Sequence, residues 1–193
     1  DAEAAHPRQT AQAIGELAGQ VIGDASTHER LRELERSDEP RFDRALWASL
    51  AETGVLGAFI PEAHGGAGLD LIALGAALEH AGRTTAAVPL WETLGLAAPA
   101  IAEFAPEALQ AEWLPKIAAG ESLVVLAQQE RRSRYRLHQV ATRAQDAGGA
   151  WTLSGAKTVV PAGDEADAFI VSARIAGAED SHDGIGLFLV AKD

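Results

Sequence analysis

The stretch LPKIAAGESLVVLAQQERRSRYRL, residues 114–137, marks the point at which the sequence changes from helical to strand-like patterning. Up to Gly120 apolar residues recur every three or four positions, as in helices that bury one face. After Gly120 the period becomes two, which is typical of strands. The apolar run from Leu123 to Ala127 then breaks into glutamines, a glutamate, arginines, a serine and a tyrosine. The stretch therefore predicts a buried strand at residues 123–127 that is followed directly by a polar segment.

The residues before Gly120 predict a series of helices. In EPRFDRALWASLAETG, residues 39–54, Pro40 suits a first helical turn and Gly54 stands where a C-terminal cap belongs. Asp70 can cap a further helix, and two more helical stretches run over about 89–104 and 106–118. The first helix is expected to bury one apolar stripe, formed by Ile14, Leu17, Val21 and Ile22.

The residues after Gly120 predict short strands that pair antiparallel, because they follow one another closely in sequence. The predicted fold is an all-α domain at residues 1–120 followed by an antiparallel, barrel-like β domain at residues 121–193. The chain stops at Asp193 directly after a strand, so we expect the β domain to be incomplete and the natural polypeptide to continue. The expected strands after Ala127 contain Leu137, Val140 and Thr142; Trp151 and Leu153; residues 168–175; and residues 184–192.

The composition excludes several classes of protein. A formal net charge of -12 repels nucleic acids and anionic membrane surfaces. The absence of cysteine excludes disulfides, thiolate metal sites and a cysteine nucleophile. The sequence has no secretory signal pattern and no apolar run long enough to cross a bilayer. We therefore expect a cytoplasmic protein that binds neither nucleic acid nor membrane.

Local patterns that resemble ligand sites have structural explanations. GGAGLD, residues 65–70, lacks the strand and helix of a dinucleotide-binding unit, and Leu71 stands where the third glycine would be. In SGAKT, residues 154–158, Ala156 interrupts the phosphate-binding pattern, and a hairpin turn explains Gly155 better. The six histidines are scattered, and His182 is expected to be a solvated loop residue, so no metal ligand is assigned.

Two explanations of the polar strand end are open from the residues alone. Polar side chains at the end of a buried strand can hydrogen-bond a ligand, and arginines there can balance a pyrophosphate. A solvated edge loop with salt bridges accounts for the same composition. The carboxylates are spread over polar helix faces, so spacing does not single out a general base.

The order of four motifs resembles the acyl-CoA dehydrogenase family from about Phe42 onward. They are AFIPEAHGGAGLD, EWLPKIAAGE, GGAWTLSGAKTVVPAGDEADAFIVSAR and GIGLFLVAKD. The resemblance implies an amino-terminal helical domain, a middle β domain and a carboxyl-terminal helical bundle, with FAD bound between the last two and across a subunit interface. This chain looks like the first domain plus part of the second.

The chain departs from the family pattern where the resemblance implies contacts with the flavin and the acyl-CoA. The family segment TEP-x-AGSD reads QERRSRY here, so Gln129 replaces the threonine and Tyr135 falls at the serine. The family segment W-I-T/S, which lies against the flavin ring, is Val159, Val160 and Pro161. The implied cofactor-binding residues are Ala127, Gln128, Gln129, Ser133, Val159, Val160 and Pro161, and the implied substrate-binding residues are Arg134 and Tyr135. Arg131, Arg132 or Arg134 can meet a phosphate.

The resemblance implies that a carboxylate removes the α proton of an acyl-CoA while hydride passes to FAD, giving a trans-2-enoyl-CoA. The family's catalytic glutamate belongs to the carboxyl-terminal domain, so no catalytic residue is assigned. The implied partners are the acyl-CoA substrate, an electron-transfer flavoprotein and another acyl-CoA dehydrogenase chain in a homo- or hetero-oligomer. The alternatives are a non-catalytic subunit that completes such a partner and a flavin monooxygenase of the same fold.

A closer resemblance points to one branch of the family. Ser133, Arg134, Tyr135 and Leu137 are similar to the pattern in the small subunit of pimeloyl-CoA dehydrogenase, whose relatives pair with a second, different chain. Fatty acid, dicarboxylic acid and sterol side-chain thioesters are all compatible with this branch. The sequence therefore predicts a subunit of a larger flavoenzyme and leaves its acyl group open.

Overall fold

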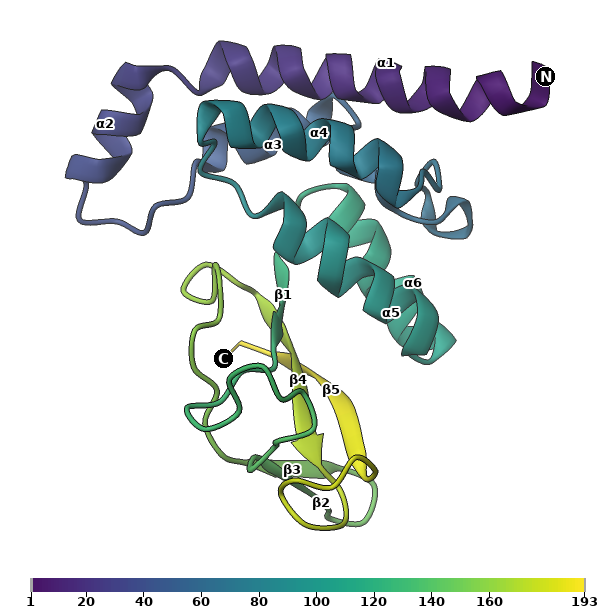
Figure 1. Cartoon of the computed structure of the whole chain (residues 1–193), viewed down its shortest axis with the longest axis vertical. Coiled ribbons are helices and arrows are strands. Elements are labelled where there is room, and N and C mark those ends of the chain that lie inside the picture. The colour runs from purple at the N-terminus through teal and green to yellow at the C-terminus, as the bar shows by residue number, and fades with distance from the viewer. Residues whose placement is uncertain (1, 193) are drawn as a thin grey trace. The chain divides into compact units, whose positions relative to one another are not determined.

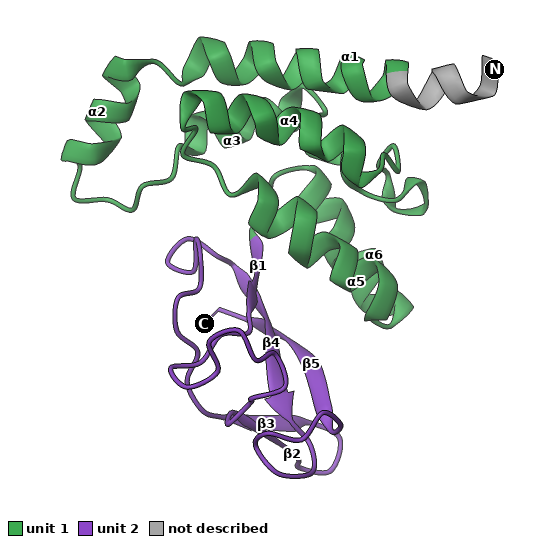
Figure 2. Ribbon diagram, in the orientation of Figure 1, with its two compact units in different colours: residues 1–123 green, residues 124–193 purple. Residues whose placement is uncertain are grey.

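The computed structural model describes the backbone of residues 2–192 and the side chains of residues 9–192. The chain divides into two compact units, residues 1–123 and 124–193 (Figure 2). Unit 1 holds the helices and unit 2 the strands (Figure 1). The predicted order, a helical region followed by a barrel-like β region, is confirmed, but the predicted antiparallel pairing is only partly right because β1 pairs with β4 in parallel. No helix in the described part of the chain is long and apolar enough to cross a membrane.

Unit 1 is built from α-helices joined by short 3₁₀ and π turns. The α-helices are α1 (Ala2–Ala25), α2 (His28–Arg36), α3 (Arg44–Glu52), α4 (Leu71–Thr84), α5 (Ala98–Phe104) and α6 (Glu107–Ala118). The 3₁₀ turns are Gly57–Phe59 and Glu62–His64, and a π-helical segment, Trp91–Ala97, leads into α5. The helical stretch expected at 89–104 is therefore helical but contains a π turn.

Helices α1 and α4 lie side by side over much of their length (Figure 1). Their approach is so close that a Cβ atom on Gly15 would lie 2.8 Å from the Cβ of Ala76. Small residues, Ala11 and Ala18, therefore join Ile22 on the buried face of α1, whereas Leu17 stays 36% exposed. The predicted apolar stripe is thus only partly buried, because the closest contact takes side chains smaller than leucine.

Aspartates cap two of the helices in unit 1. The Asp70 side chain accepts a hydrogen bond from the Ala73 N–H at 3.0 Å, so its predicted role is confirmed. Helix α3 begins after Asp43, whose carboxylate accepts from the Leu46 N–H and from Arg30. The prediction that Pro40 occupies the first turn is wrong, because this cap starts the helix after Asp43.

Unit 1 also carries an apolar groove of about 540 Å³. One wall is the face of α1 that includes Ile14 and Leu17. The other wall is formed by the glycine-rich loop from Gly54 to Leu69. The groove explains why part of the predicted stripe of α1 is not buried against α4.

Unit 2 is a curled mixed sheet with β4 at its centre (Figure 1). Its strands are β1 (Val124–Ala127), β2 (Arg143–Asp146), β3 (Trp151–Ser154), β4 (Ala168–Arg174) and β5 (Ile185–Ala191). The β2–β3 and β4–β5 pairs are antiparallel, whereas β4 runs parallel to β1 and meets β2 at one parallel bridge. The long connection between β1 and β4 allows the parallel pairing.

Two local predictions for unit 2 are wrong. Leu137, Val140 and Thr142 lie outside the strands, because the Ala141 and Thr142 N–H groups donate to the Glu130 carboxylate rather than to a neighbouring strand. Gly155 ends β3 but makes no hairpin with β4, which pairs with β1, β2 and β5. A glycine is needed there because a Cβ atom would lie 2.5 Å from the Thr142 hydroxyl.

Candidate functional site at the end of β1

The end of β1 lies beside the segment that follows Lys157. Ala127 is buried as the last residue of β1, and Gln128 and Gln129 then leave the sheet with exposed side chains. The Gln129 carbonyl accepts from the Thr158 N–H at 2.8 Å, and the Gln128 carbonyl accepts from Lys157 Nζ at 3.3 Å. The two segments that the sequence singled out, 127–135 and 159–161, are therefore brought together within unit 2.

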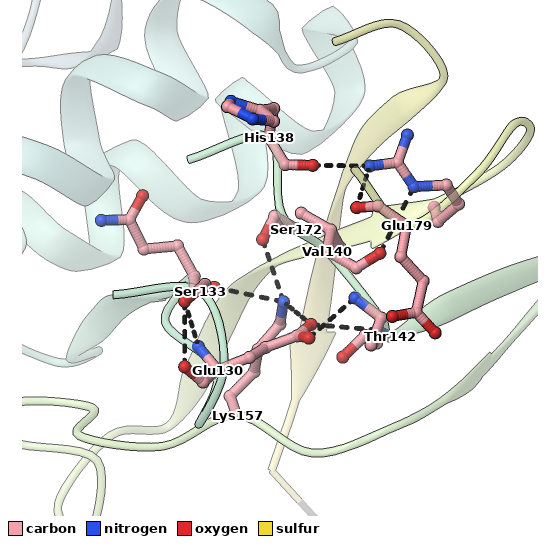
Figure 3. A network of polar contacts seen from close by, with 11 residues as sticks. Glu130, Ser133, His138, Val140, Thr142, Lys157, Ser172 and Glu179 are labelled. Carbon is pink, nitrogen blue, oxygen red and sulfur yellow. Dashed lines mark hydrogen bonds and ion pairs between the residues drawn. The ribbon is translucent and has the colours of Figure 1, made fainter. Parts of the chain in front are cut away.

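A buried ion pair joins these segments. Lys157 Nζ lies 2.8 Å from Glu130 Oε1, and both side chains are 8% exposed. The same ammonium group donates to the Ser172 hydroxyl on β4 at 3.0 Å (Figure 3). The Glu130 carboxylate also accepts the Ala141 and Thr142 N–H groups, at 2.7 and 3.0 Å. The Glu130 carboxylate, at the end of β1, is thus bonded both to Lys157 and to the two residues that precede β2.

The environment of Glu130 keeps this carboxylate ionised. Burial alone would raise its pKa, but hydrogen bonds from Lys157 and from the Thr142 and Ala141 backbone lower the pKa to about 2. Its oxygens already accept three hydrogen bonds. Glu130 is therefore suited to fixing the site and unsuited to acting as a general base near neutral pH.

Ser133 shapes the loop that follows Glu130. Its hydroxyl accepts from the Glu130 N–H and donates to the Glu130 carbonyl, both at 2.9 Å. The side chain is 4% exposed. Gln128 and Gln129 are thus the exposed polar side chains of the predicted cofactor set in this segment, while Ser133 is engaged within the loop.

The loop of residues 131–137, called the arginine loop below, directs its long side chains into solvent. Tyr135 is 99% exposed and Leu137 is 71% exposed. The structure records no ion pair between the loop's guanidinium groups and any side chain of residues 9–192. The exposed arginines of the loop are Arg131, Arg132, Arg134 and Arg136.

The segment 159–161 faces outward with an unusual backbone. Val159 has a φ of 52° and is 74% exposed, although a β-branched side chain disfavours the left-handed region. The neighbouring Thr158–Gln129 hydrogen bond and a Gly163 N–H to Val160 carbonyl bond hold the segment in place. Pro161 is exposed and Val160 is half-buried. The segment presents an apolar surface without a hydroxyl or an aromatic ring.

Arg174, which sequence reasoning did not single out, organises the far end of the sheet. It is 1% exposed, and its guanidinium group donates to five backbone carbonyls. Figure 3 shows two of these acceptors on His138 and Val140. The exposed His182 stacks its ring on that of His138, with 4.0 Å between centroids. The remaining acceptors of Arg174 are the carbonyls of Glu179, Ser181 and Asp183.

Signals for the missed residues are present in the sequence. Lys157 is one of three lysines in the chain and lies between two apolar runs. Arg174 is a charged residue at the end of an otherwise apolar strand, where burial requires hydrogen-bonding partners. Glu130 is the single acidic residue in the polar strand end. Of the three, Arg174 alone directly follows buried residues, because exposed residues precede Glu130 and Lys157.

The donor set at the end of β1 fits a phosphate-bearing cofactor such as FAD. The guanidinium groups of the arginine loop, which have no ion-pair partner among the side chains of residues 9–192, suit phosphate oxygens. The exposed amides of Gln128 and Gln129 can donate to and accept from a polar ring system. The apolar surface of Val159 and Pro161 suits a flat, largely apolar ring. Among residues 9–192 no group of three or more His, Cys, Asp or Glu side chains is arranged to hold a metal ion.

Comparison with known proteins gives a family match. Residues 8–121 match the family model described as "Acyl-CoA dehydrogenase, N-terminal domain". The chain is 33% identical to acyl-CoA dehydrogenase FadE27 of Mycobacterium tuberculosis over 183 residues, which cover 95% of this chain and 46% of that protein. The chain thus spans about half the length of this curated relative.

Solved structures resemble the chain over nearly its whole length. A variant of the Tcur3481-Tcur3483 steroid ACAD superposes with a TM-score of 0.85 at 40% identity, covering 96% of this chain and 48% of that one. The ChsE4-ChsE5 complex from Mycobacterium tuberculosis gives a TM-score of 0.82 at 33% identity, covering 94% of this chain and 47% of that one.

Proposed function

This chain belongs to the acyl-CoA dehydrogenase family, and from that premise we propose that it is part of an FAD-dependent acyl-CoA dehydrogenase. The proposed reaction is α,β-dehydrogenation of an acyl-CoA thioester to the trans-2-enoyl-CoA. FAD would supply the acceptor for the hydride that leaves the β carbon. We propose that the electrons then pass to an electron-transfer flavoprotein.

One observation carries this proposal: two hydrogen bonds and an ion pair hold the end of β1 beside the segment that leads into residues 159–161. The Thr158–Gln129 hydrogen bond and the Lys157–Glu130 ion pair join segments that are nearly thirty positions apart in sequence. The resemblance implied flavin contacts for both segments. Their proximity supports a common ligand, because exposed side chains of both segments can contact one bound molecule.

We assign different tasks to the residues on this surface. The Gln128 and Gln129 side chains would hydrogen-bond the cofactor, and Val159, Val160 and Pro161 would form the apolar wall against its ring. Lys157 and Glu130 would not touch the cofactor but would hold both segments in register. Ser133, engaged with Glu130, would fix the loop that carries Arg134 and Tyr135 toward the substrate.

We further propose that the enzyme contains a second acyl-CoA dehydrogenase chain. Two structures similar to this chain are named as pairs, Tcur3481-Tcur3483 and ChsE4-ChsE5. The first is called a steroid ACAD, and its 40% identity supports a steroid-type acyl group as the substrate. This choice favours one of the acyl classes that the sequence left open.

A second candidate function is a subunit that completes a partner enzyme without binding flavin itself. The observation in its favour is the strained, exposed Val159 at the position of the family's flavin-facing aromatic residue. The exchange of threonine for Gln129 removes a hydroxyl from the same surface. In this alternative the apolar segment would contact protein rather than a flavin ring.

A visible absorption spectrum distinguishes the two candidates. The full-length protein is purified alone and after co-expression with a second acyl-CoA dehydrogenase chain, and a steroid-type acyl-CoA is added without oxygen. The proposal predicts a flavin band that bleaches on this addition, in one sample or in both. A second chain that carries flavin and bleaches equally well without this protein contradicts the catalytic role.

A further inference from the structure

A pair of stacked histidines joins two segments of unit 2. The rings of His138 and His182 lie with 4.0 Å between their centroids and 24° between their planes. Aromatic rings in proteins usually lie at least about 4.5 Å apart, so no water molecule or counter-ion fits between these two. His182 belongs to the loop 175–184, which connects β4 to β5, whereas His138 directly follows the arginine loop. The stack therefore holds together two segments that are far apart in the sequence.

The backbones of both histidines are bound to one buried cation. The Arg174 guanidinium group donates to the His138 carbonyl at 2.7 Å (Figure 3). It also donates to the carbonyls on either side of His182, which are those of Ser181 and Asp183, at 3.2 and 2.7 Å. Backbone hydrogen bonds thus bring the two rings face to face, and the stack adds a side-chain contact to the same junction.

No carboxylate is bonded to either ring. The structure records no hydrogen bond or ion pair of the two imidazoles among the side chains of residues 9–192. The charged residues around the pair are Arg136 in the arginine loop, Arg143 on β2, Arg174 on β4, and Glu179, Asp180 and Asp183 in the loop 175–184. The three carboxylates are exposed, so water and salt screen their attraction for a charged imidazole. Repulsion between two charged rings in direct contact is screened much less.

We propose that His138 and His182 form a pH-sensitive clasp for the loop 175–184. An imidazole in water is half-protonated near about pH 6.5. Above that pH the rings are neutral and stack, and one protonated ring can still stack on a neutral one. When both rings carry a proton, two positive charges lie 4.0 Å apart beside the Arg174 guanidinium group, and the rings separate. The clasp is closed at neutral pH and opens as the pH falls below about 6. It needs neither flavin nor acyl-CoA, so it is independent of the proposed function.

Hydrogen exchange of the full-length protein at about pH 7.5 and about pH 5.5 tests the clasp. The amides of Val140, Ile175 and Ser181 are followed, because each donates a backbone hydrogen bond at this junction. Protection factors are compared, which removes the effect of pH on the exchange chemistry itself. We expect the wild-type protein to lose about tenfold in protection at the lower pH.

Variants without one imidazole separate the clasp from other effects of pH. His182→Phe and His138→Phe keep an aromatic ring but remove a proton site, so protection in each should be the same at both pH values. His28→Gln, which removes an exposed histidine of α2, should lose as much protection as the wild-type protein. Glu130, with its pKa of about 2, keeps its charge over this range and contributes no change of its own.

The amides within β4 provide the internal reference. Weakening of the whole of unit 2 at low pH would lower their protection by the same factor as at the junction, and such a result would overturn the proposal. Equal protection of the wild-type protein at both pH values would overturn it as well. So would a loss in His182→Phe or in His138→Phe as large as in the wild-type protein, because the two rings would then not act as a pair.

Discussion

The arginines of unit 2 occupy two opposite environments. Arg174 is buried, and its guanidinium group donates hydrogen bonds to five backbone carbonyls. The guanidinium groups of the arginine loop are exposed and unpaired among the side chains of residues 9–192. Burial and backbone hydrogen bonds commit Arg174 to the fold, whereas exposure leaves the loop arginines able to bind a ligand. Stability measurements on variants of unit 2 test which of its charged side chains build the fold.

Loss of the buried arginine should have the largest effect. Arg174→Met leaves five carbonyls without their donor, and we expect a loss of about 4 kcal/mol in the stability of unit 2. Hydrogen exchange of the amides in residues 138–142 and 179–183 should accelerate accordingly. The matched control is Arg143→Met on the exposed face of β2, for which exchange should stay unchanged. Equal exchange rates in the two variants would refute the organising role of Arg174.

Breaking the buried ion pair should have the next largest effect. Lys157→Met leaves the Glu130 carboxylate buried without a counter-charge, which we expect to cost about 3 kcal/mol. Glu130→Gln in the same chain removes the stranded charge and should restore part of that loss. A urea titration of the single and double variants measures the coupling. Additive losses would show that the two residues do not act as a pair.

The same pair predicts a dependence of stability on pH. The pKa of Glu130 is lowered from 4.5 to about 2 in the folded protein, so its contribution is complete above about pH 4.5. The contribution is lost as the pH falls toward 2, and on the order of 3 kcal/mol is at stake. Unfolding titrations at stepwise lower pH should show this loss in the wild-type chain and a shallower slope in Glu130→Gln. Parallel slopes would contradict the low pKa.

Loss of the exposed arginines should have the smallest effect on stability. Arg132→Ala and Arg136→Ala remove charges that contact no partner among the described side chains, so the free energy of unfolding should change by less than about 0.5 kcal/mol. Urea titrations of these variants beside the wild-type protein provide the measurement. A loss of about 2 kcal/mol or more would place these arginines with Arg174, among the residues that build the fold.

Much of the fold follows from local patterns in the sequence. The change of period at Gly120 predicts helices before strands, and Asp70 and Gly54 mark helix ends that the structure contains. The parallel pairing of β1 with β4 does not follow from local patterns, because it joins segments separated by a long connection. The buried face of α1 is also hard to predict, since the close approach of α4 favours alanine over leucine.

The candidate site was predictable only in part. The polar end of β1 and the segment 159–161 can be found from the sequence, because both depart from a recognisable family pattern. The contact between Lys157 and Glu130 cannot be found in this way, since the two residues are 27 positions apart in the sequence. The missing strand at Leu137–Thr142 has the same cause, because a side chain replaces a neighbouring strand as the hydrogen-bond acceptor.

The central claim is that the surface formed by residues 127–129 and 159–161 binds the flavin. It is tested most directly by an experimental structure of the full-length protein, purified with the proposed partner chain and saturated with FAD and a steroid-type acyl-CoA. Our account predicts that the flavin ring lies against Gln128, Gln129 and Val159. A structure in which protein side chains cover this surface, while the flavin is held by other residues, would contradict it.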